Sequence, residues 1–307
     1  MQFLYLLEDI RIPVLNEIML LITSLGEETA FLAIALVLFW CVDKRQGYYI
    51  MSVGFFGTMA NQFLKLLCRI PRPWILDENF TIVEQAREAA TGYSFPSGHT
   101  QNAVGTFGGI ALTSKNRWVR TICIALAVLV PFSRMYLGVH TPQDVLVAAV
   151  MALILMFVLR PVVYREDGKG MKILLPVMIA VAMAFLLYVE FFPFPADMDQ
   201  HNLESGYKNA YTLLGALIGI AVVYAVDEKK LHFPVKAVWW AQLLKVGIGL
   251  LLVLGVKSGL KAPLEALFGG HMAARAVRYF LLVIVAGIVW PLSFPWFGQL
   301  GQKEKSN

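Results

Sequence analysis

Three short polar segments interrupt an otherwise apolar sequence, and each carries residues that could do chemistry. The first is KLLCRIPRP at 65–73, with Lys65 and Arg72. The second is PSGH at 96–99, and the third is SRMYLGVHTPQD at 133–144, which includes Arg134. Ionisable residues beside apolar spans are costly, so their concentration in three segments indicates a functional site. For each cation taken alone, ordinary snorkelling at a helix end is the alternative.

Taken together, these residue types suit a phosphate dianion. The three cations supply fixed positive charge, and a guanidinium can donate two parallel hydrogen bonds to phosphate oxygens. The hydroxyl of Ser97 and the backbone N–H groups of Gly98 and His99 stand where a helix is expected to begin, so they would add donors and a favourable dipole. Gly98 also permits close approach of a ligand to the backbone.

Two histidines and one carboxylate in the same segments could supply a nucleophile and an acid–base group. Asp144 follows His140 by four residues. It could accept a hydrogen bond from one ring nitrogen, which fixes the tautomer and leaves the other nitrogen to attack. A capping or core histidine is the alternative for His99 and for His140. The alternative for Asp144 is a helix N-cap carboxylate, since Pro142 marks the start of a helix.

The elements that position these segments must cross a membrane. Hydrophobic residues make up 58% of the 307 residues and charged residues only 15%, below the roughly 25% charged that soluble domains carry. Apolar runs close to the roughly 20 residues that a membrane-crossing helix needs recur along the chain. We therefore expect an all-α integral membrane protein, a polytopic helical bundle of about nine spans. The expected spans are 29–43, 47–67, 97–113, 118–137, 142–160, 172–193, 209–226, 237–256 and 276–296.

The chain is expected to have three parts. Residues 4–25 carry four charged residues and a proline among apolar positions, which favours a helix lying at the membrane interface, although a tenth span stays open. The first part, 1–28, is therefore an interfacial or partly inserted helix. The second, 29–163, is a core with the three motifs, and the third, 164–307, holds additional C-terminal transmembrane helices.

The loops differ in charge if the spans alternate in direction. One face carries 14 Lys and Arg residues and the other 8, with the three motif cations and the intramembrane Lys245 left out. The positive-inside rule makes the more basic face cytoplasmic. The motifs then open on the extracytoplasmic side, and we expect a multi-pass protein of a bacterial plasma membrane. The basic face holds Lys44, Arg45, Lys115, Arg117, Arg120, Arg160, Arg165, Lys169, Lys172, Lys229, Lys230, Lys236, Lys303 and Lys305.

The motifs resemble the signature of the type 2 phosphatidic acid phosphatase superfamily. The matching blocks are Lys65 with six residues before Arg72-Pro73, then Pro96-Ser97-Gly98-His99, then Ser133-Arg134 with His140 and Asp144. The resemblance covers roughly residues 29 to 160, and the motif context is also similar to the sphingosine-phosphate phosphatase branch. The resemblance implies that His140 is phosphorylated, that Asp144 orients His140, and that His99 acts as general acid and then as general base. It also implies a set of phosphate-binding residues, which are Lys65, Arg72, Ser97, Gly98 and Arg134.

This resemblance implies a metal-independent phosphoric ester hydrolase that acts on lipid phosphates and needs no cofactor. The motifs pair three cations with one carboxylate, whereas metal sites of phosphoryl-transfer enzymes gather several carboxylates. The expected partners are the lipid phosphate and the bilayer, and no basic helix interleaved with aromatics points to nucleic acid. Oligomeric state stays open. So does the lipid, which could be phosphatidic acid, phosphatidylglycerophosphate, a polyprenyl phosphate or diphosphate, or a long-chain-base phosphate.

Two other functional classes are compatible with the basic pocket. One is a lipid-phosphate binding, transport or scrambling module with a vestigial phosphatase site, and the other is an assembly partner. Neither would need both histidines and Asp144. Of the remaining residues, Cys41, Cys68 and Cys123 show no metal-ligand spacing. Lys245 is expected to face the bundle interior and to find a carboxylate or a carbonyl there.

Overall fold

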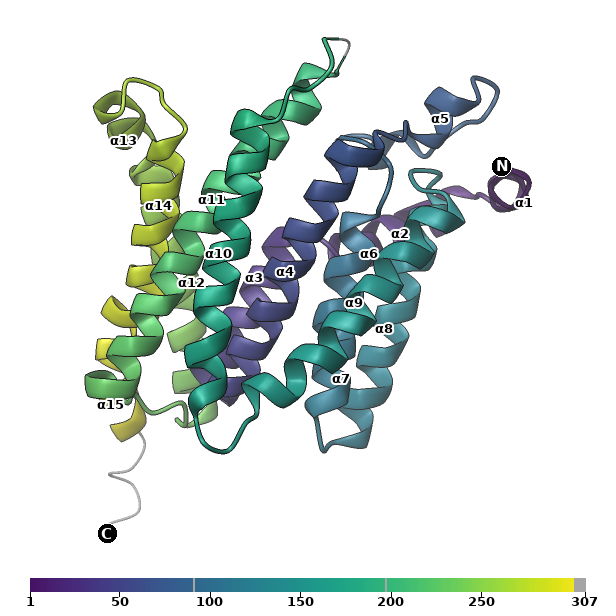
Figure 1. The fold of residues 1–307 in the computed structure, drawn as a ribbon. Coiled ribbons are helices and arrows are strands. Elements are labelled where there is room, and N and C mark those ends of the chain that lie inside the picture. The colour runs from purple at the N-terminus through teal and green to yellow at the C-terminus, as the bar shows by residue number, and fades with distance from the viewer. Residues whose placement is uncertain (91, 197, 301–307) are drawn as a thin grey trace. The chain divides into compact units, whose positions relative to one another are not determined.

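The structure is a computed structural model that describes residues 1–90, 92–196 and 198–300, and every regular element in these ranges is helical (Figure 1). The expected all-α class is therefore confirmed. Lys303 and Lys305, which the charge count places on the basic face, lie outside the described residues. The α-helices are α1 (Gln2–Asp9), α2 (Pro13–Ser24), α3 (Glu28–Val37), α4 (Lys44–Cys68), α5 (Pro73–Leu76), α6 (Gly98–Ala103), α7 (Gly109–Thr113), α8 (Arg117–Tyr136), α9 (Pro142–Val163), α10 (Lys169–Phe191), α11 (Gln200–Val226), α12 (Trp239–Gly259), α13 (Lys261–Leu267), α14 (Ala273–Ile284) and α15 (Phe294–Gln299).

Six helices within the described residues are long and apolar enough to cross a membrane, which makes the chain an integral membrane protein. A seventh span is possible if Pro13–Ser24 and Glu28–Val42, which meet at 53°, form one broken span. The six are Arg117–Tyr136, Pro142–Val163, Lys169–Phe191, Gln200–Leu231, Trp239–Leu267 and Ala273–Gln299.

The expected count of about nine spans and the single N-terminal helix are not confirmed. The expected span 47–67 falls in α4, which is long enough but too polar, because it carries Asn61, Gln62 and Lys65. The expected span 97–113 is divided into α6, a π-helical segment η3 (Val104–Gly108) and α7. Residues 4–25 form parts of two helices, α1 and α2, because Pro13 begins a second helix after an extended Ile12.

The chain forms two compact units. Unit 1 consists of Met1–Ile34, Tyr49–Val162 and Pro193–Gly206, and unit 2 consists of Ala35–Tyr48, Val163–Phe192 and the chain from Tyr207. Every residue of the three motifs lies in unit 1.

Helix α8 is the centre of unit 1. It packs against α1, α2, α6, η3 and α7. Phe107 and Ala111 belong to one apolar cluster with Val130 of α8, and Met19 of α2 belongs to another with Tyr136 at the end of α8. Burial of these side chains holds the end of α8, where the polar segment 133–144 begins, against α2 and the η3–α7 segment.

Unit 2 is built around α12. This helix packs against α14, α15 and two π-helical segments, η1 (Leu38–Val42) and η5 (Val285–Val289). Lys245 of α12 is fully buried, and its Nζ donates a hydrogen bond to the carbonyl oxygen of Val235 at 3.0 Å. Nζ also lies 4.4 Å from the centre of the Phe294 ring. The prediction that Lys245 finds an interior partner is confirmed, and that partner is a carbonyl with an aromatic face beside it.

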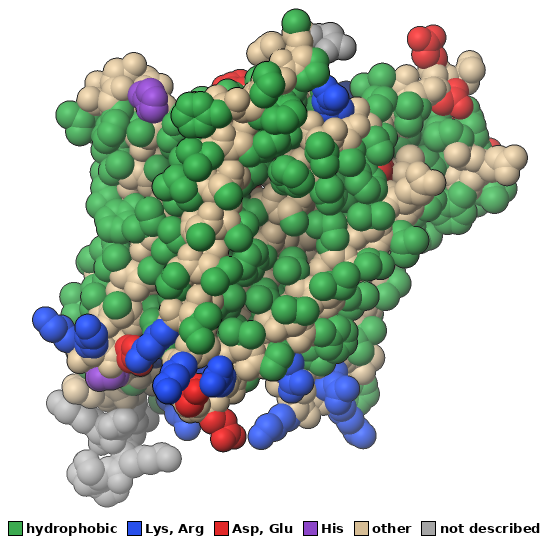
Figure 2. Space-filling view, in the orientation of Figure 1, with side chains coloured by type: hydrophobic (Ala, Val, Ile, Leu, Met, Phe, Trp, Pro, Cys, Tyr) green, Lys and Arg blue, Asp and Glu red, His purple; other side chains and the backbone are tan. Residues whose placement is uncertain are grey.

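Charged side chains gather near the ends of the helices. Figure 2 shows most of the visible lysine and arginine side chains at one end and hydrophobic side chains along the helix lengths. In unit 2, Lys44, Arg45 and Arg165 line a cavity with Asp227 and Glu228. Apolar helix lengths bounded by charged ends are what a bilayer requires of a spanning bundle. Which end faces the cytoplasm stays a prediction.

Candidate active site

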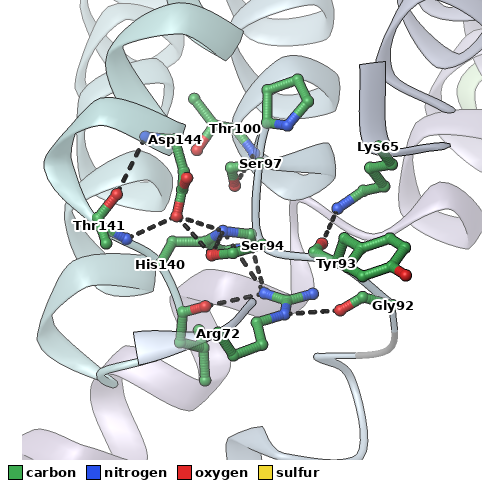
Figure 3. A network of polar contacts seen from close by, with 12 residues as sticks. Lys65, Arg72, Gly92, Tyr93, Ser94, Ser97, Thr100, His140, Thr141 and Asp144 are labelled. Atoms are coloured by element: carbon green, nitrogen blue, oxygen red, sulfur yellow. Dashed lines mark hydrogen bonds and ion pairs between the residues drawn. The ribbon is translucent and has the colours of Figure 1, made fainter. Parts of the chain in front are cut away.

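The three motifs come together in unit 1. The first lies at the end of α4 and in the loop that follows, the second at the start of α6, and the third at the end of α8 and the start of α9. Lys65, Arg72, Gly98, His99 and His140 line one cavity of about 170 Å³. Figure 3 shows polar side chains from these elements pointing toward one another.

His140 is buried between a carboxylate and a guanidinium. Its Nδ1 lies 3.4 Å from Oδ2 of Asp144, and its Nε2 lies 2.8 Å from Nη1 of Arg72. Arginine can only donate hydrogen bonds, so Nε2 is the acceptor and the ring hydrogen belongs on Nδ1, facing Asp144. In this tautomer Nε2 carries the lone pair that a nucleophile needs.

Charge and burial keep the imidazole of His140 neutral. Burial lowers its pKa well below the usual value, and the positive charges of Arg72, Arg134 and Lys65 lower it further. Arg72 stays protonated at neutral pH, because burial lowers its pKa only to about 10 while Asp144 opposes the shift. The site therefore places a neutral imidazole nitrogen beside a protonated guanidinium, and the role of His140 as nucleophile stays a prediction.

Asp144 both caps α9 and faces His140. Oγ1 of Thr141 accepts a hydrogen bond from the backbone N–H of Asp144 at 3.3 Å, and Oδ2 of Asp144 accepts one from the backbone N–H of Thr141 at 2.7 Å. This reciprocal pair is a capping box. Thr141 is therefore the N-cap, and Asp144 is the third helical residue, which closes the box. The same Oδ2 lies 3.4 Å from Nδ1 of His140, and an orienting role for Asp144 stays a prediction.

Three backbone carbonyls hold the cations of the first motif. The carbonyl oxygen of Gly92 accepts a hydrogen bond from Nε of Arg72 at 2.9 Å, and that of Tyr93 accepts one from Nζ of Lys65. Nη1 of Arg72 donates a further bond to the carbonyl oxygen of Val139 at 2.8 Å. These contacts hold both cations at the cavity wall before any ligand binds, which lowers the cost of arranging them around a phosphate.

Ser94 connects all three motifs, and this role was not predicted from the sequence. Its backbone N–H donates to the carbonyl oxygen of Ile70 at 2.8 Å. Its hydroxyl donates to Oδ2 of Asp144 at 2.5 Å and lies 3.5 Å from Nδ1 of His140. Ser94 is fully buried. The only signal in the sequence was its place within YSFPSGHT, two residues before the second motif.

Ser97 and Gly98 start helix α6. Oγ of Ser97 accepts a hydrogen bond from the backbone N–H of Thr100 at 3.4 Å, so the hydroxyl is the helix cap. A β-carbon placed on Gly98 would meet no atom nearer than Oδ1 of Asn61 at 3.9 Å. The backbone of Gly98 is therefore open toward the cavity, as close approach of a ligand requires. Contact of either residue with phosphate stays a prediction.

Three buried nitrogens of the predicted site residues have no hydrogen-bond partner in the part of the chain that the structure describes. They are Nε2 of His99 and Nε and Nη2 of Arg134. Arg134 is fully buried at the end of α8, and His99 lines the cavity. Buried polar groups are nearly always paired, so the unpaired Nε2 of His99 on the cavity wall indicates where an acceptor oxygen of a ligand would lie.

Known proteins are similar to the part of the chain that carries the three motifs. The model of the PAP2 superfamily matches residues 44–167, and that of the PAP2 superfamily phosphatase transmembrane extension matches residues 211–303. The chain is 33% identical over 150 residues to undecaprenyl-diphosphatase BcrC of Bacillus subtilis (strain 168), which covers 47% of this chain and 72% of that protein. The chain belongs to the PAP2 superfamily.

Two further PAP2 relatives are similar over comparable lengths. Phosphatidylglycerophosphatase B of Bacillus subtilis (strain 168) is 32% identical over 164 residues, 49% of this chain and 76% of that protein. An undecaprenyl-diphosphatase of Sulfolobus acidocaldarius is 28% identical over 137 residues, 44% of this chain and 65% of that protein. No solved structure matches the chain.

The PAP2 match confirms the resemblance seen in the motifs. It includes every predicted site residue, from Lys65 to Asp144, and begins after α3. The PAP2 transmembrane extension matches residues 211–303, which exclude α10 and the first part of α11. The division of the chain at residue 164 stays a prediction. The similarity to the sphingosine-phosphate phosphatase branch stays a prediction.

A polar stripe on α4 was also missed from the sequence. Thr58, Asn61 and Gln62 line the cavity together with Lys65. The spacing of three, four and seven residues from Thr58 puts them on one face of a helix, so a search for polar helical periodicity could have found them. This stripe gives the PAP2 cavity neutral hydrogen-bonding groups next to its cations.

Proposed function

We propose that this protein removes the terminal phosphate from a lipid phosphate or diphosphate through a phosphohistidine on His140. The observation that carries the proposal is the geometry of His140, with Nε2 on the cationic side at 2.8 Å from Arg72 and Nδ1 toward Asp144 at 3.4 Å. The relatives are named as undecaprenyl-diphosphatases and a phosphatidylglycerophosphatase, which supports a membrane lipid as substrate.

In the first step, the lone pair of His140 Nε2 attacks phosphorus and the bond from phosphorus to the lipid oxygen breaks. Because Nη1 of Arg72 donates to Nε2 in this structure, oxygens of the incoming phosphate must take over that donor. Arg72, Lys65 and Arg134 stabilise the charge on the phosphoryl oxygens. His99 enters this step as the imidazolium, gives its Nε2 proton to the leaving oxygen and is left as neutral imidazole. Asp144 balances the positive charge on the phosphorylated ring.

In the second step, water replaces the histidine. His99 now lacks its proton and takes one from a water molecule, whose oxygen attacks phosphorus. The bond from phosphorus to Nε2 breaks, inorganic phosphate leaves, and both histidines return to their starting states. Covalent catalysis of this kind divides one difficult displacement into two easier ones.

Phosphate release by purified protein tests this function directly. We expect detergent-solubilised protein to release inorganic phosphate from at least one of the candidate lipid phosphates, with full activity in the presence of a strong chelator, because three protein cations already neutralise the phosphate. Orthovanadate should inhibit by adopting the geometry of the transition state. No release from any substrate would favour a binding or transport module. Activity that chelation abolishes and magnesium restores would contradict the metal-independent mechanism.

We further propose that the site opens on the extracytoplasmic side, as the loop charges suggest. In a background without Cys41, Cys68 and Cys123, single cysteines replace Glu88, before the second motif, and Glu166, in the basic loop after α9. Both side chains are exposed. An impermeant maleimide should label Glu88→Cys in intact cells.

Glu166→Cys is the matched control for this orientation. It should react only after the cells are permeabilised, which also proves that the residue is accessible to the reagent. The reverse pattern, with Glu166→Cys labelled in intact cells and Glu88→Cys protected, would overturn the orientation while leaving the chemistry of the site unaffected.

A further inference from the structure

The guanidinium of Arg134 is held by one side chain from outside the three motifs. Nη1 donates a hydrogen bond to Oγ1 of Thr23 at 2.9 Å, while Nε and Nη2 have no partner among the described residues. The group is planar, so holding Nη1 fixes the direction of the edge formed by Nε and Nη2. Through the N–H groups on that edge, arginine can donate two parallel hydrogen bonds to two oxygens of a phosphate.

Thr23 belongs to a helix that is firmly attached to α8. It is 5% exposed, in the last turn of α2. Near the other end of α2, Oδ1 of Asn16 accepts a hydrogen bond from the hydroxyl of Tyr136 at 2.9 Å. Nε of Arg11 donates to the carbonyl oxygen of Tyr136 at 2.9 Å. The position of Thr23 is thus set by contacts on the same turn of α8 that carries Arg134.

The turn after α2 also touches the start of α6. A β-carbon on Gly26 would lie 2.9 Å from the carbonyl oxygen of His99 and 3.1 Å from its Cβ. Nδ2 of Asn102 donates a hydrogen bond to the carbonyl oxygen of Gly26 at 3.3 Å. Only a residue without a side chain lets this turn approach His99 so closely.

We propose that α2 and the turn after it are a fourth part of the active site, in which Thr23 is a positioning residue for Arg134. Thr23 holds Nη1 so that Nε and Nη2 together bind two oxygens of the phosphoryl group. The inference rests on the proposed function. It concerns a segment outside residues 44–167, the part that matches the PAP2 model.

The decisive substitution is Thr23→Val, which keeps the shape of the side chain and removes the acceptor oxygen. We expect the inhibition constant for orthovanadate to rise, and kcat/KM to fall, by roughly ten- to one-hundred-fold, as loss of a hydrogen bond to a charged group predicts. Thr23→Ser retains the hydroxyl and should restore most of the affinity. Thr106→Val is the matched control, because Thr106 is a buried threonine whose hydroxyl has no partner in the described residues.

A double-mutant cycle separates positioning from general stability. Arg134→Lys removes the edge formed by Nε and Nη2, so adding Thr23→Val to it should weaken orthovanadate binding no further, measured as the rise in melting temperature that orthovanadate causes. Equal orthovanadate affinity in wild type and Thr23→Val, or additive losses in the double variant, would overturn the inference. If wild-type protein neither releases phosphate nor binds orthovanadate, the proposed function fails instead.

Discussion

His140→Ala is expected to lower turnover by roughly three to six orders of magnitude, the scale seen when a nucleophile is removed from a cooperating set of catalytic groups. His140 is buried between Asp144 and Arg72, and no other imidazole in the described residues has a ring nitrogen in that position. Without Nε2 no covalent intermediate can form. The measurement is steady-state phosphate release with the best lipid substrate found for the wild type.

A histidine outside the site provides the control for this result. His201 lies at the start of α11 in unit 1 and is exposed, so His201→Ala should keep wild-type turnover. Circular dichroism and melting temperature show whether either variant has lost its fold. A folded His140→Ala protein that keeps more than about a tenth of wild-type turnover would refute its role as nucleophile.

The types and spacing of Lys65, Arg72 and His140 predicted that they belong to one site, and the structure places all three on one cavity. Their roles in the reaction stay predictions. The contacts that orient them could not be read in this way. Thr23 lies 111 residues from Arg134, and Ser94 lies 50 residues from Asp144. Pairings at such separations depend on the packed fold.

The expected count of about nine spans was not confirmed for a related reason. The apolar run at 47–67 predicted a span, but α4 is not among the six described helices that are long and apolar enough to cross a membrane. In the structure the polar side chains of Thr58, Asn61 and Gln62 line the cavity. Phe55 and Met59 of the same helix are buried apolar residues. A helix that lines a polar cavity carries such a stripe of polar residues. The stripe lowers the mean hydropathy of the whole helix, so a count of spans based on mean hydropathy leaves the helix out.

The contacts of Asp144 show that a helix-capping carboxylate can also face the site. The sequence offered a helix N-cap and an orienting carboxylate as alternatives, and the orienting role stays a prediction. The capping box with Thr141 fixes the carboxylate in the first turn of α9, and this fixed position brings Oδ2 to 3.4 Å from Nδ1 of His140. Local capping is therefore the means by which the orienting contact is positioned.

His99→Ala should separate the two steps of the reaction. With an alkyl phosphate lipid we expect nearly complete loss of activity, because an alkoxide cannot leave without a proton. An aryl phosphate has a better leaving group and needs less acid assistance. The variant should therefore still phosphorylate His140 with the aryl substrate and then stall, since the base that activates water is missing. The buried Nε2 of His99, unpaired in the described residues and on the same cavity as His140, is the atom that would carry this proton.

Single-turnover labelling with an activated radiolabelled aryl phosphate, quenched in alkali, tests this division of roles. His99→Ala should retain an alkali-stable, acid-labile label, as a phosphohistidine does, whereas His140→Ala should retain none. The wild type should show label only briefly, because its second step is intact. Equal label on both variants, or label on His140→Ala alone, would reverse or remove the assigned roles. The two histidines line one cavity, but only His140 has a carboxylate oriented toward its second nitrogen, and for that reason we expect the phosphoryl group to rest on His140.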